Sequence, residues 1–119
     1  MDLCLVGSEM CIRDSGIIIE DEWGLRNVES IIDNEFIDLV YVGTYDIAQT
    51  LGKSANHKDV FKILEKTTKI IRDSNKSVGC LFHSKNELKK FQSIGVNFLT
   101  YGVDTKVLYD SFHQIAKWR

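Results

Sequence analysis

Acidic side chains follow two apolar runs of this 119-residue chain, at positions where they could bind a cation. Glu20 directly ends the run 17–19, and Asp46 lies just beyond the run 39–42, behind Gly43. Carboxylates at neighbouring strand ends can meet on one ion, because adjacent parallel strands lie about 4.8 Å apart. Carboxylate ligands with room for water suit Mg²⁺ or Mn²⁺. The spacing is compatible with a metal site at Glu20 and Asp46, but from spacing alone the interpretation of these acids as helix caps or solvated loop charges is favoured.

Other side chains with reactive groups have less specific patterns. His83 follows a third apolar run, where it could act as an acid or base or simply precede a helix cap at Ser84. His57 and His113 have no cysteine or carboxylate cluster at ligand spacing and are interpreted as structural. Cys80 lies inside an apolar run, which favours a core position over a nucleophile. Neither glycine-rich phosphate-binding motif occurs, so no motif supports nucleotide binding.

The apolar pattern predicts four strand–helix units that must position these groups. The expected strands are 17–19, 39–42, 78–82 and 97–101. Apolar residues at three- and four-residue steps predict helices near 25–32, 60–71, 85–94 and from 104 onward. In the last helix, Leu108, Phe112 and Ile115 are expected to face inward. Short, uninterrupted apolar strands that alternate with helices are typical of a parallel sheet in an α/β fold.

Two α/β architectures are compatible with this pattern. One is a small open doubly wound domain, and the other is part of a (β/α)8 barrel. A complete barrel needs roughly 200 residues or more, so the chain could supply about half of one. In both architectures the functional side chains gather at the carboxyl ends of the strands.

Composition and charge exclude several classes of protein. The chain is 44% hydrophobic and 27% charged, as in an ordinary folded domain. No run approaches the ~20 apolar residues of a membrane span, and the first residues lack the pattern of a secretory signal. Three cysteines without a C-x-x-C pair indicate a reducing compartment. A net charge of −2 lacks the basic footprint of a nucleic-acid binder. We therefore expect a cytoplasmic protein with neither nucleic-acid nor membrane partners.

From about Gly16 onward the sequence resembles the HpcH/HpaI aldolase and citrate lyase family, of the phosphoenolpyruvate/pyruvate barrel superfamily. The resemblance rests on the order and spacing of the strand ending in Glu20, the segment 37–47, the turn at 51–52, His57 with Val60, and the segments 76–79 and 102–105. It implies a domain over 16–119 that is the C-terminal half, about four β/α units, of a TIM (β/α)8 barrel.

The resemblance also implies roles for individual residues. Glu20 and Asp46 would bind the metal. The segment formed by Gly43, Thr44, Tyr45 and Asp46 would hold the carboxylate of a 2-oxo acid through its backbone N–H groups. Thr44 departs from the proline usual in the family, and Ile18 stands where many members have glutamine. The family's catalytic base lies on earlier strands that are absent here, so the catalytic residue is unknown.

The activity that the resemblance implies is that of a metal-dependent (class II) aldolase, a carbon–carbon lyase of the 4-hydroxy-2-oxo acid aldolase type. Such an enzyme cleaves or forms a carbon–carbon bond of a 2-oxo acid via a pyruvate enolate, with Mg²⁺ or Mn²⁺ as cofactor and an aldehyde as the second partner. A homo-oligomer is expected for the full-length protein. The alternatives are a lyase acting on a coenzyme-A thioester in the same fold, of the citrate or malyl type, and a non-catalytic α/β module.

The first residues do not fit this resemblance. Residues 1–15 resemble translated sequencing-adapter read-through, so we expect them to be a non-native N-terminal artefact. The chain would then be a truncated fragment. Half a barrel leaves two sheet edges unpaired, so we expect the fragment alone to be inactive and poorly folded as a monomer.

Overall fold

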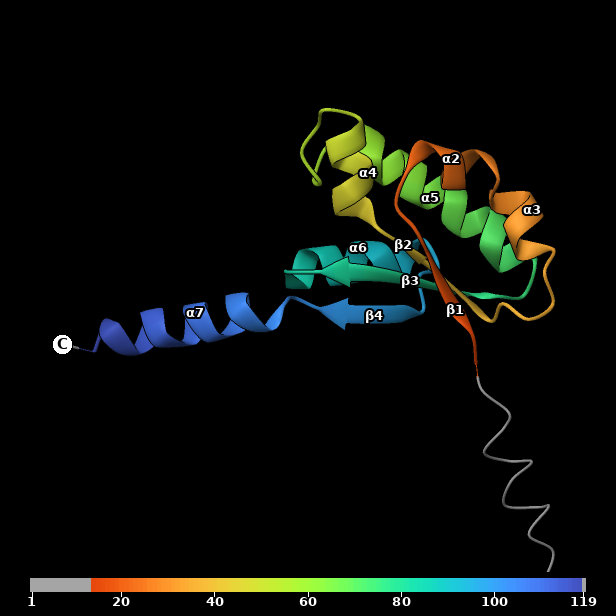
Figure 1. Cartoon of the computed structure of the whole chain (residues 1–119). Helices are drawn as coiled ribbons and strands as arrows, with labels where there is room; N and C mark the ends of the chain where they lie inside the picture. Colours follow the sequence, from red (N-terminus) through yellow and green to blue (C-terminus); the bar gives the residue numbers. More distant parts are fainter. Residues whose placement is uncertain (1–13, 119) are drawn as a thin grey trace, which may run out of the picture.

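The computed structural model describes residues 14–118, which form a four-stranded parallel sheet and six helices (Figure 1). The strands are β1 (Gly16–Ile19), β2 (Leu39–Val42), β3 (Ser77–Phe82) and β4 (Phe98–Tyr101). The helices are α2 (Glu22–Arg26), α3 (Val28–Ile32), α4 (Thr44–Thr50), α5 (Lys58–Asp73), α6 (Lys85–Ser93) and α7 (Asp104–Ala116). Most of the expected artefact at 1–15 lies outside the described residues.

The strand order distinguishes the two architectures. The strands pair in sequence order, β1-β2-β3-β4, and every pair is parallel. A doubly wound sheet reverses its strand order at a switch point, whereas a barrel places each strand beside the next one along the chain. The order therefore favours a barrel segment over the doubly wound alternative.

One face of the sheet carries the hydrophobic core. Val40 and Val42 of β2 and Val78 and Cys80 of β3 are fully buried on this face. The helical side chains that join them in one cluster are Val28, Ile32, Ile47, Leu64 and Ile71, with Phe91 of α6 and Ile94, which directly follows α6, packed at its margin. β-branched residues dominate these strands because their branched side chains pack well on a pleated surface.

On the other face of the sheet, a tyrosine side chain crosses from one strand to another. Tyr41 of β2 extends over Gly79 of β3, where a Cβ would lie 2.4 Å from the Tyr41 Cδ2. The Tyr41 hydroxyl reaches the Thr100 Oγ1 of β4 at 2.5 Å. Burial raises the pKa of Tyr41 above its ordinary value. A glycine at position 79 thus lets one side chain span three strands.

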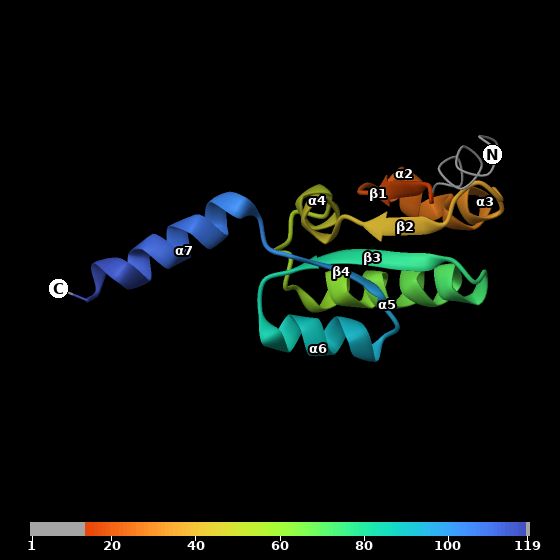
Figure 2. The ribbon, with the colours of Figure 1, turned by 90° about the horizontal axis from the view of Figure 1, so that it is seen from below.

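The last helix contradicts the expectation that its apolar residues face inward. Leu108 and Phe112 are 57% and 68% exposed, and Ile115 is also exposed. Figures 1 and 2 show α7 extending away from the sheet beyond β4. An amphipathic pattern shows that one face of a helix suits a partner, but it does not place that partner. No residue of α7, all of which the structure describes, is buried.

Two further helices differ from the sequence-based expectation. The segment predicted as one helix near 25–32 is divided at Asn27 into α2 and α3. A short helix, α4, begins at Thr44, where the pattern predicted only a loop. Across residues 14–118, no helix has the length and apolar character required to cross a bilayer.

Candidate metal and substrate site

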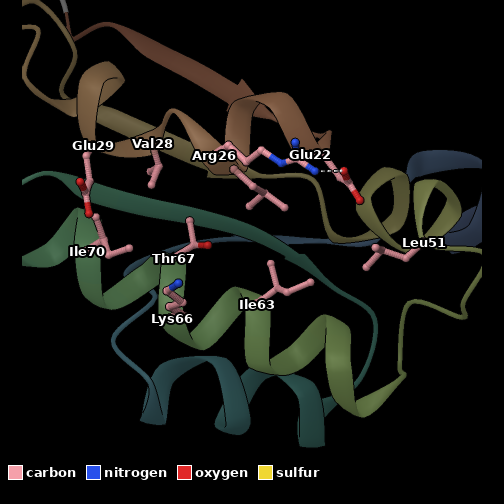
Figure 3. Close-up of a pocket in the computed structure, with 10 residues that line it drawn as sticks. Glu22, Arg26, Val28, Glu29, Leu51, Ile63, Lys66, Thr67 and Ile70 are labelled. Carbon is pink, nitrogen blue, oxygen red and sulfur yellow. Dashed lines mark hydrogen bonds and ion pairs between the residues drawn. The ribbon is translucent and has the colours of Figure 1, made fainter.

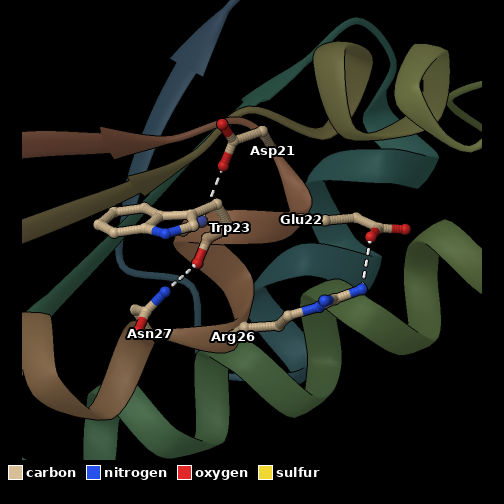
Figure 4. Close-up of polar contacts among 6 residues, drawn as sticks. Asp21, Glu22, Trp23, Arg26 and Asn27 are labelled. Carbon is tan, nitrogen blue, oxygen red and sulfur yellow. Dashed lines mark hydrogen bonds and ion pairs between the residues drawn. The ribbon is translucent and has the colours of Figure 1, made fainter.

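The three adjacent acids after β1 have different partners. The Asp21 carboxylate accepts a hydrogen bond of 2.7 Å from the Gly24 N–H and so caps α2. Glu22 forms a 2.8 Å ion pair with Arg26 one helical turn later (Figure 4). Glu20 takes part in neither arrangement. The helix-cap interpretation therefore describes Asp21, and Glu20 remains a candidate ligand.

Glu20 and Asp46 come together on either side of Gly43. A Cβ at position 43 would lie 3.1 Å from the Glu20 Cβ and 3.5 Å from the Asp46 Oδ2. Glu20 follows β1, and Asp46 lies in the first turn of α4 after β2, the strand paired with β1. The Glu20 Cβ and the Asp46 carboxylate therefore both lie beside Gly43, at the ends of neighbouring strands. A side chain at position 43 would be a tight fit, because its Cβ would press on the Glu20 Cβ.

The two carboxylates have no cationic partner within residues 14–118. The ion pairs among residues 14–118 use other carboxylates, so no lysine or arginine there neutralises Glu20 or Asp46. Nowhere in this part of the chain do three histidine, cysteine, aspartate or glutamate side chains gather as a metal-binding group. Mg²⁺ is often held by only one or two carboxylates, with substrate oxygens and water as its other ligands. Glu20 and Asp46 fit that pattern.

Backbone donors stand beside these carboxylates at the start of α4. The Ile47 N–H donates the first intrahelical bond, of 3.0 Å, to the Gly43 carbonyl. The N–H groups of Thr44, Tyr45 and Asp46 precede it and belong to the unpaired first turn. The Gly43 N–H, by contrast, donates to the Ile19 carbonyl at 2.8 Å and is already occupied. Of the predicted carboxylate-binding segment, positions 44–46 offer donors.

The side chain of Thr44 points into the protein. Thr44 is buried, and its Oγ1 lies 3.9 Å from the Cys80 Sγ. Burial raises the pKa of the Cys80 thiol to about 11, which keeps it protonated and agrees with its predicted core position. Thr44 is the first residue of α4, a position that tolerates proline because its N–H has no intrahelical partner. The departure from the family's proline is therefore compatible with the same local fold.

A contact that the sequence did not reveal lies one strand further along this edge. The rings of Tyr45 and His83 meet edge to face, with centroids 5.4 Å apart and an interplanar angle of 89°. The His83 backbone N–H donates to the Glu87 carboxylate at 2.7 Å. Burial raises the pKa of Tyr45, and the negative charge of Glu87 adds to this effect. The sequence shows that both residues lie just beyond neighbouring strands, which places them at the same edge of the sheet. It does not show that Tyr45 points toward His83, because that direction depends on helix α4.

The remaining histidines and one cavity lie outside this site. The His57 Nδ1 accepts from the Asp59 N–H at 3.2 Å and caps α5, and His113 stacks on Tyr109 of α7. A cavity of about 440 Å³ opens between α2, α3 and α5 in the helical layer (Figure 3). Its apolar wall includes Leu25 and Ile63. It lies among the helices rather than over the carboxyl edge of the sheet.

Known proteins resemble this chain in sequence and in fold. The profile of the HpcH/HpaI aldolase/citrate lyase family matches residues 16–111. The chain is 31% identical over 111 residues to a 2-keto-3-deoxy-L-rhamnonate aldolase of Shigella dysenteriae serotype 1. A protein of the same name from Escherichia coli K12 matches with equal identity. Each match covers 92% of this chain and 40% of the relative, so the chain spans about two fifths of the curated relatives' length.

Solved structures confirm the predicted partial barrel. The citrate synthase SbnG superposes with a TM-score of 0.80 at 20% identity, over 96% of this chain and 49% of SbnG. An HpcH/HpaI aldolase/citrate lyase family protein from Burkholderia cenocepacia J2315 gives a TM-score of 0.80 at 21% identity, over 87% of this chain and 41% of its own. At these identities the likeness establishes the fold alone. With residues 16–111 matched by the family profile, the chain belongs to the HpcH/HpaI aldolase/citrate lyase family.

Proposed function

We propose that this chain provides the metal and carboxylate-binding part of an enzyme that cleaves or forms a carbon–carbon bond of a 2-oxo acid with an aldehyde partner. The observation that carries the proposal is the position of Glu20 and Asp46 on either side of Gly43 at the carboxyl edge of a parallel sheet. Active sites of barrel enzymes form at this edge. Family membership supports the lyase class.

Different groups of the chain would bind the metal and the substrate. Glu20 and Asp46 would hold Mg²⁺ or Mn²⁺, and the N–H groups of Thr44, Tyr45 and Asp46 would bind the carboxylate of the 2-oxo acid. Backbone N–H groups at a helix start favour an anion because their partial positive charges point at it. A bound divalent ion supplies positive charge that polarises the 2-oxo group.

Cleavage leaves pyruvate as an enolate that must be protonated, so the reaction also needs a base or acid. None of His57, His83 and His113 is assigned to that step. We therefore propose that the 119-residue chain alone binds ligand without turnover. A lyase acting on a coenzyme-A thioester would use the same carboxylates and remains the alternative within this fold.

Metal affinity tests the proposed function directly. We expect the chain to bind Mn²⁺ in calorimetry, more tightly with pyruvate present, because pyruvate completes the ligand set. Glu20→Gln and Asp46→Asn keep the side-chain shape but remove a charged ligand. Each should weaken Mn²⁺ binding by at least about 10–100-fold. Substitution of residues that only hydrogen-bond to metal ligands already causes a loss of this size.

Glu22→Gln is the matched control, because Glu22 has the same chemistry two residues away but pairs with Arg26. This variant should bind Mn²⁺ as the wild type does. Mn²⁺ or Mg²⁺ should also raise the melting temperature of the wild type and leave that of Asp46→Asn unchanged. Undiminished metal binding by both carboxylate variants would refute the proposal and favour the non-catalytic module.

A further inference from the structure

We propose that a cavity between α5 and α6 binds a zwitterionic α-amino acid with an apolar side chain. The cavity has a volume of about 300 Å³, within the range of small-molecule sites. Residues of both helices line it, together with Ala55 and Asn56 before α5 and Thr44 at the start of α4. Neither Glu20 nor Asp46 belongs to its wall. The inference therefore concerns a second ligand, beyond the proposed lyase function.

One part of the cavity wall is apolar. Val60 and Leu64 of α5 are each 1% exposed, and Phe91 of α6 faces them from the margin of the core. Phe61 of α5 is half-buried and contributes an aromatic ring to the same wall. An apolar side chain placed against these residues would leave water, which favours its binding. This part of the cavity suits the side chain of an amino acid such as leucine.

Two opposite charges line the same cavity without forming an ion pair. Glu87 and Lys90 lie three residues apart on α6, a spacing at which such side chains often pair. Instead, the Glu87 carboxylate accepts a 2.7 Å bond from the His83 N–H, and the Lys90 Nζ lies 3.6 Å from the centroid of the Phe61 ring. The ion pairs within residues 14–118 include neither side chain. Each charge is therefore held by a different neighbour.

This arrangement of charges fits a zwitterion. One Glu87 oxygen is bound to the His83 N–H, and the other can accept a bond from a ligand ammonium group. Lys90 can bind the ligand carboxylate. The Cβ atoms of residues three apart on a helix lie about 5–6 Å from each other, so the ammonium and carboxylate groups of one α-amino acid can reach both. A simple anion would be repelled by Glu87, and a simple cation by Lys90.

Leucine and three analogues test this recognition. The analogue 4-methylpentanoate lacks the ammonium group, 3-methylbutylamine lacks the carboxylate, and glycine lacks the side chain. We expect the 119-residue chain to bind L-leucine in calorimetry. Each analogue should bind at least about tenfold more weakly, because it loses either one charged hydrogen bond or the apolar contact.

Two substitutions on α6 assign each charge to its part of the ligand. Lys90→Met should weaken leucine and 4-methylpentanoate by about tenfold but not 3-methylbutylamine, which has no carboxylate. Glu87→Gln keeps an oxygen that can accept from the His83 N–H. It should weaken leucine and 3-methylbutylamine but not 4-methylpentanoate. Lys89→Met is the matched control, since Lys89 is exposed on α6 outside the cavity, and it should change none of the affinities.

The metal dependence of binding separates this inference from the proposed function. Leucine should bind without Mg²⁺ or pyruvate and equally well to Asp46→Asn, because Asp46 does not line the cavity. A requirement for Mg²⁺ would place leucine at the carboxyl edge of the sheet and overturn the inference. Equal affinity for leucine and 4-methylpentanoate, equal weakening of all ligands by either α6 variant, or no binding of leucine would also overturn it. None of these results changes the binding of Mn²⁺ and pyruvate, which tests the proposed function separately.

Discussion

The helices α5 and α7 have similar amphipathic sequences and opposite environments. In α5, Leu64 is 1% exposed and joins the core under β2 and β3. In α7, Leu108 is 57% exposed, and the helix extends away from the sheet. The apolar residues of both helices recur at the spacing of one helical face. The difference lies in what surrounds them: α5 is flanked by α3, α4 and the sheet, whereas α7 follows the last strand and makes no comparable contact with another element in residues 14–118.

This comparison separates two kinds of information in a sequence. Apolar periodicity reports the tendency of a helix to bury one face, and both helices have it, α5 more strongly than α7. Burial itself depends on which elements are near, and that is decided by strand order and chain connection. A β/α unit in the middle of this sheet has neighbours on both sides, and the unit at its edge does not.

The largest expected effect tests this contrast with one matched substitution. Leu64→Ala removes a buried side chain and should lower the free energy of unfolding by about 2–5 kcal/mol. Leu108→Ala should change it by less than about 0.5 kcal/mol, as is usual for surface positions. Urea unfolding followed by circular dichroism measures both. A large loss from Leu108→Ala would show that α7 packs against a partner surface in solution.

A smaller effect is expected on the face of the sheet that carries Tyr41. Gly79→Ala places a methyl group into the ring of Tyr41 and should lower the free energy of unfolding by about 1–3 kcal/mol. In the Tyr41→Ala background the same change should cost less, because the obstructing ring is gone. Gly16→Ala is the control, since its Cβ would be 3.4 Å from the nearest Leu39 atom. Additive costs for positions 41 and 79 would contradict the contact.

The smallest expected effect on stability at neutral pH is that of the buried Cys80 thiol, because its contribution changes only at alkaline pH. The pKa of Cys80 rises to about 11 in the folded chain, so the folded state keeps a proton that the unfolded state releases earlier. This contribution to stability is complete below the unfolded pKa of about 8.5 and is lost as pH rises toward 11. A Cys80→Ser variant should therefore lose less stability between pH 8.5 and 10.5 than the wild type.

Thiol labelling provides an independent measurement of the same contrast. At pH 8, peptide mass spectrometry should find Cys80 unlabelled by iodoacetamide in the folded chain and labelled in urea. Ser111→Cys places a thiol on exposed α7 and should react without urea. Equal labelling of both positions under native conditions would mean that the reagent reaches Cys80 in the folded chain and that this side of β3 is accessible to solvent.

Much of the fold was predictable because it depends on short-range patterns. The four apolar runs became the four strands with shifts of about one residue, and Ser84 caps α6 through a bond from the Glu87 N–H, as its spacing indicated. The left-handed Gly95 ends the same helix, since glycine adopts φ of +99° without strain. These features involve residues close in sequence, whose physical preferences act locally.

The rest depended on contacts between distant residues. The approach of Glu20 to Asp46 was predictable in outline, because parallel strand ends lie at one edge, but its metal role stays a prediction. The Tyr45–His83 contact was not predictable, because it requires the unexpected helix α4. The break at Asn27 was also missed, since apolar spacing alone continues through it. No local rule distinguishes such a break from a continuous helix.

The bond between Tyr41 and Thr100 gives the sheet a mechanical property that its strand pairing does not. β2 and β4 share no backbone bonds, since β3 separates them, yet the tyrosine links them directly. A force on α7 passes into β4 and then reaches β2 by two routes, through the β3 backbone and through this side chain. The strand that leads to Gly43 and Asp46 is thereby linked to the last strand of the sheet by a side-chain contact as well as through the backbone of β3.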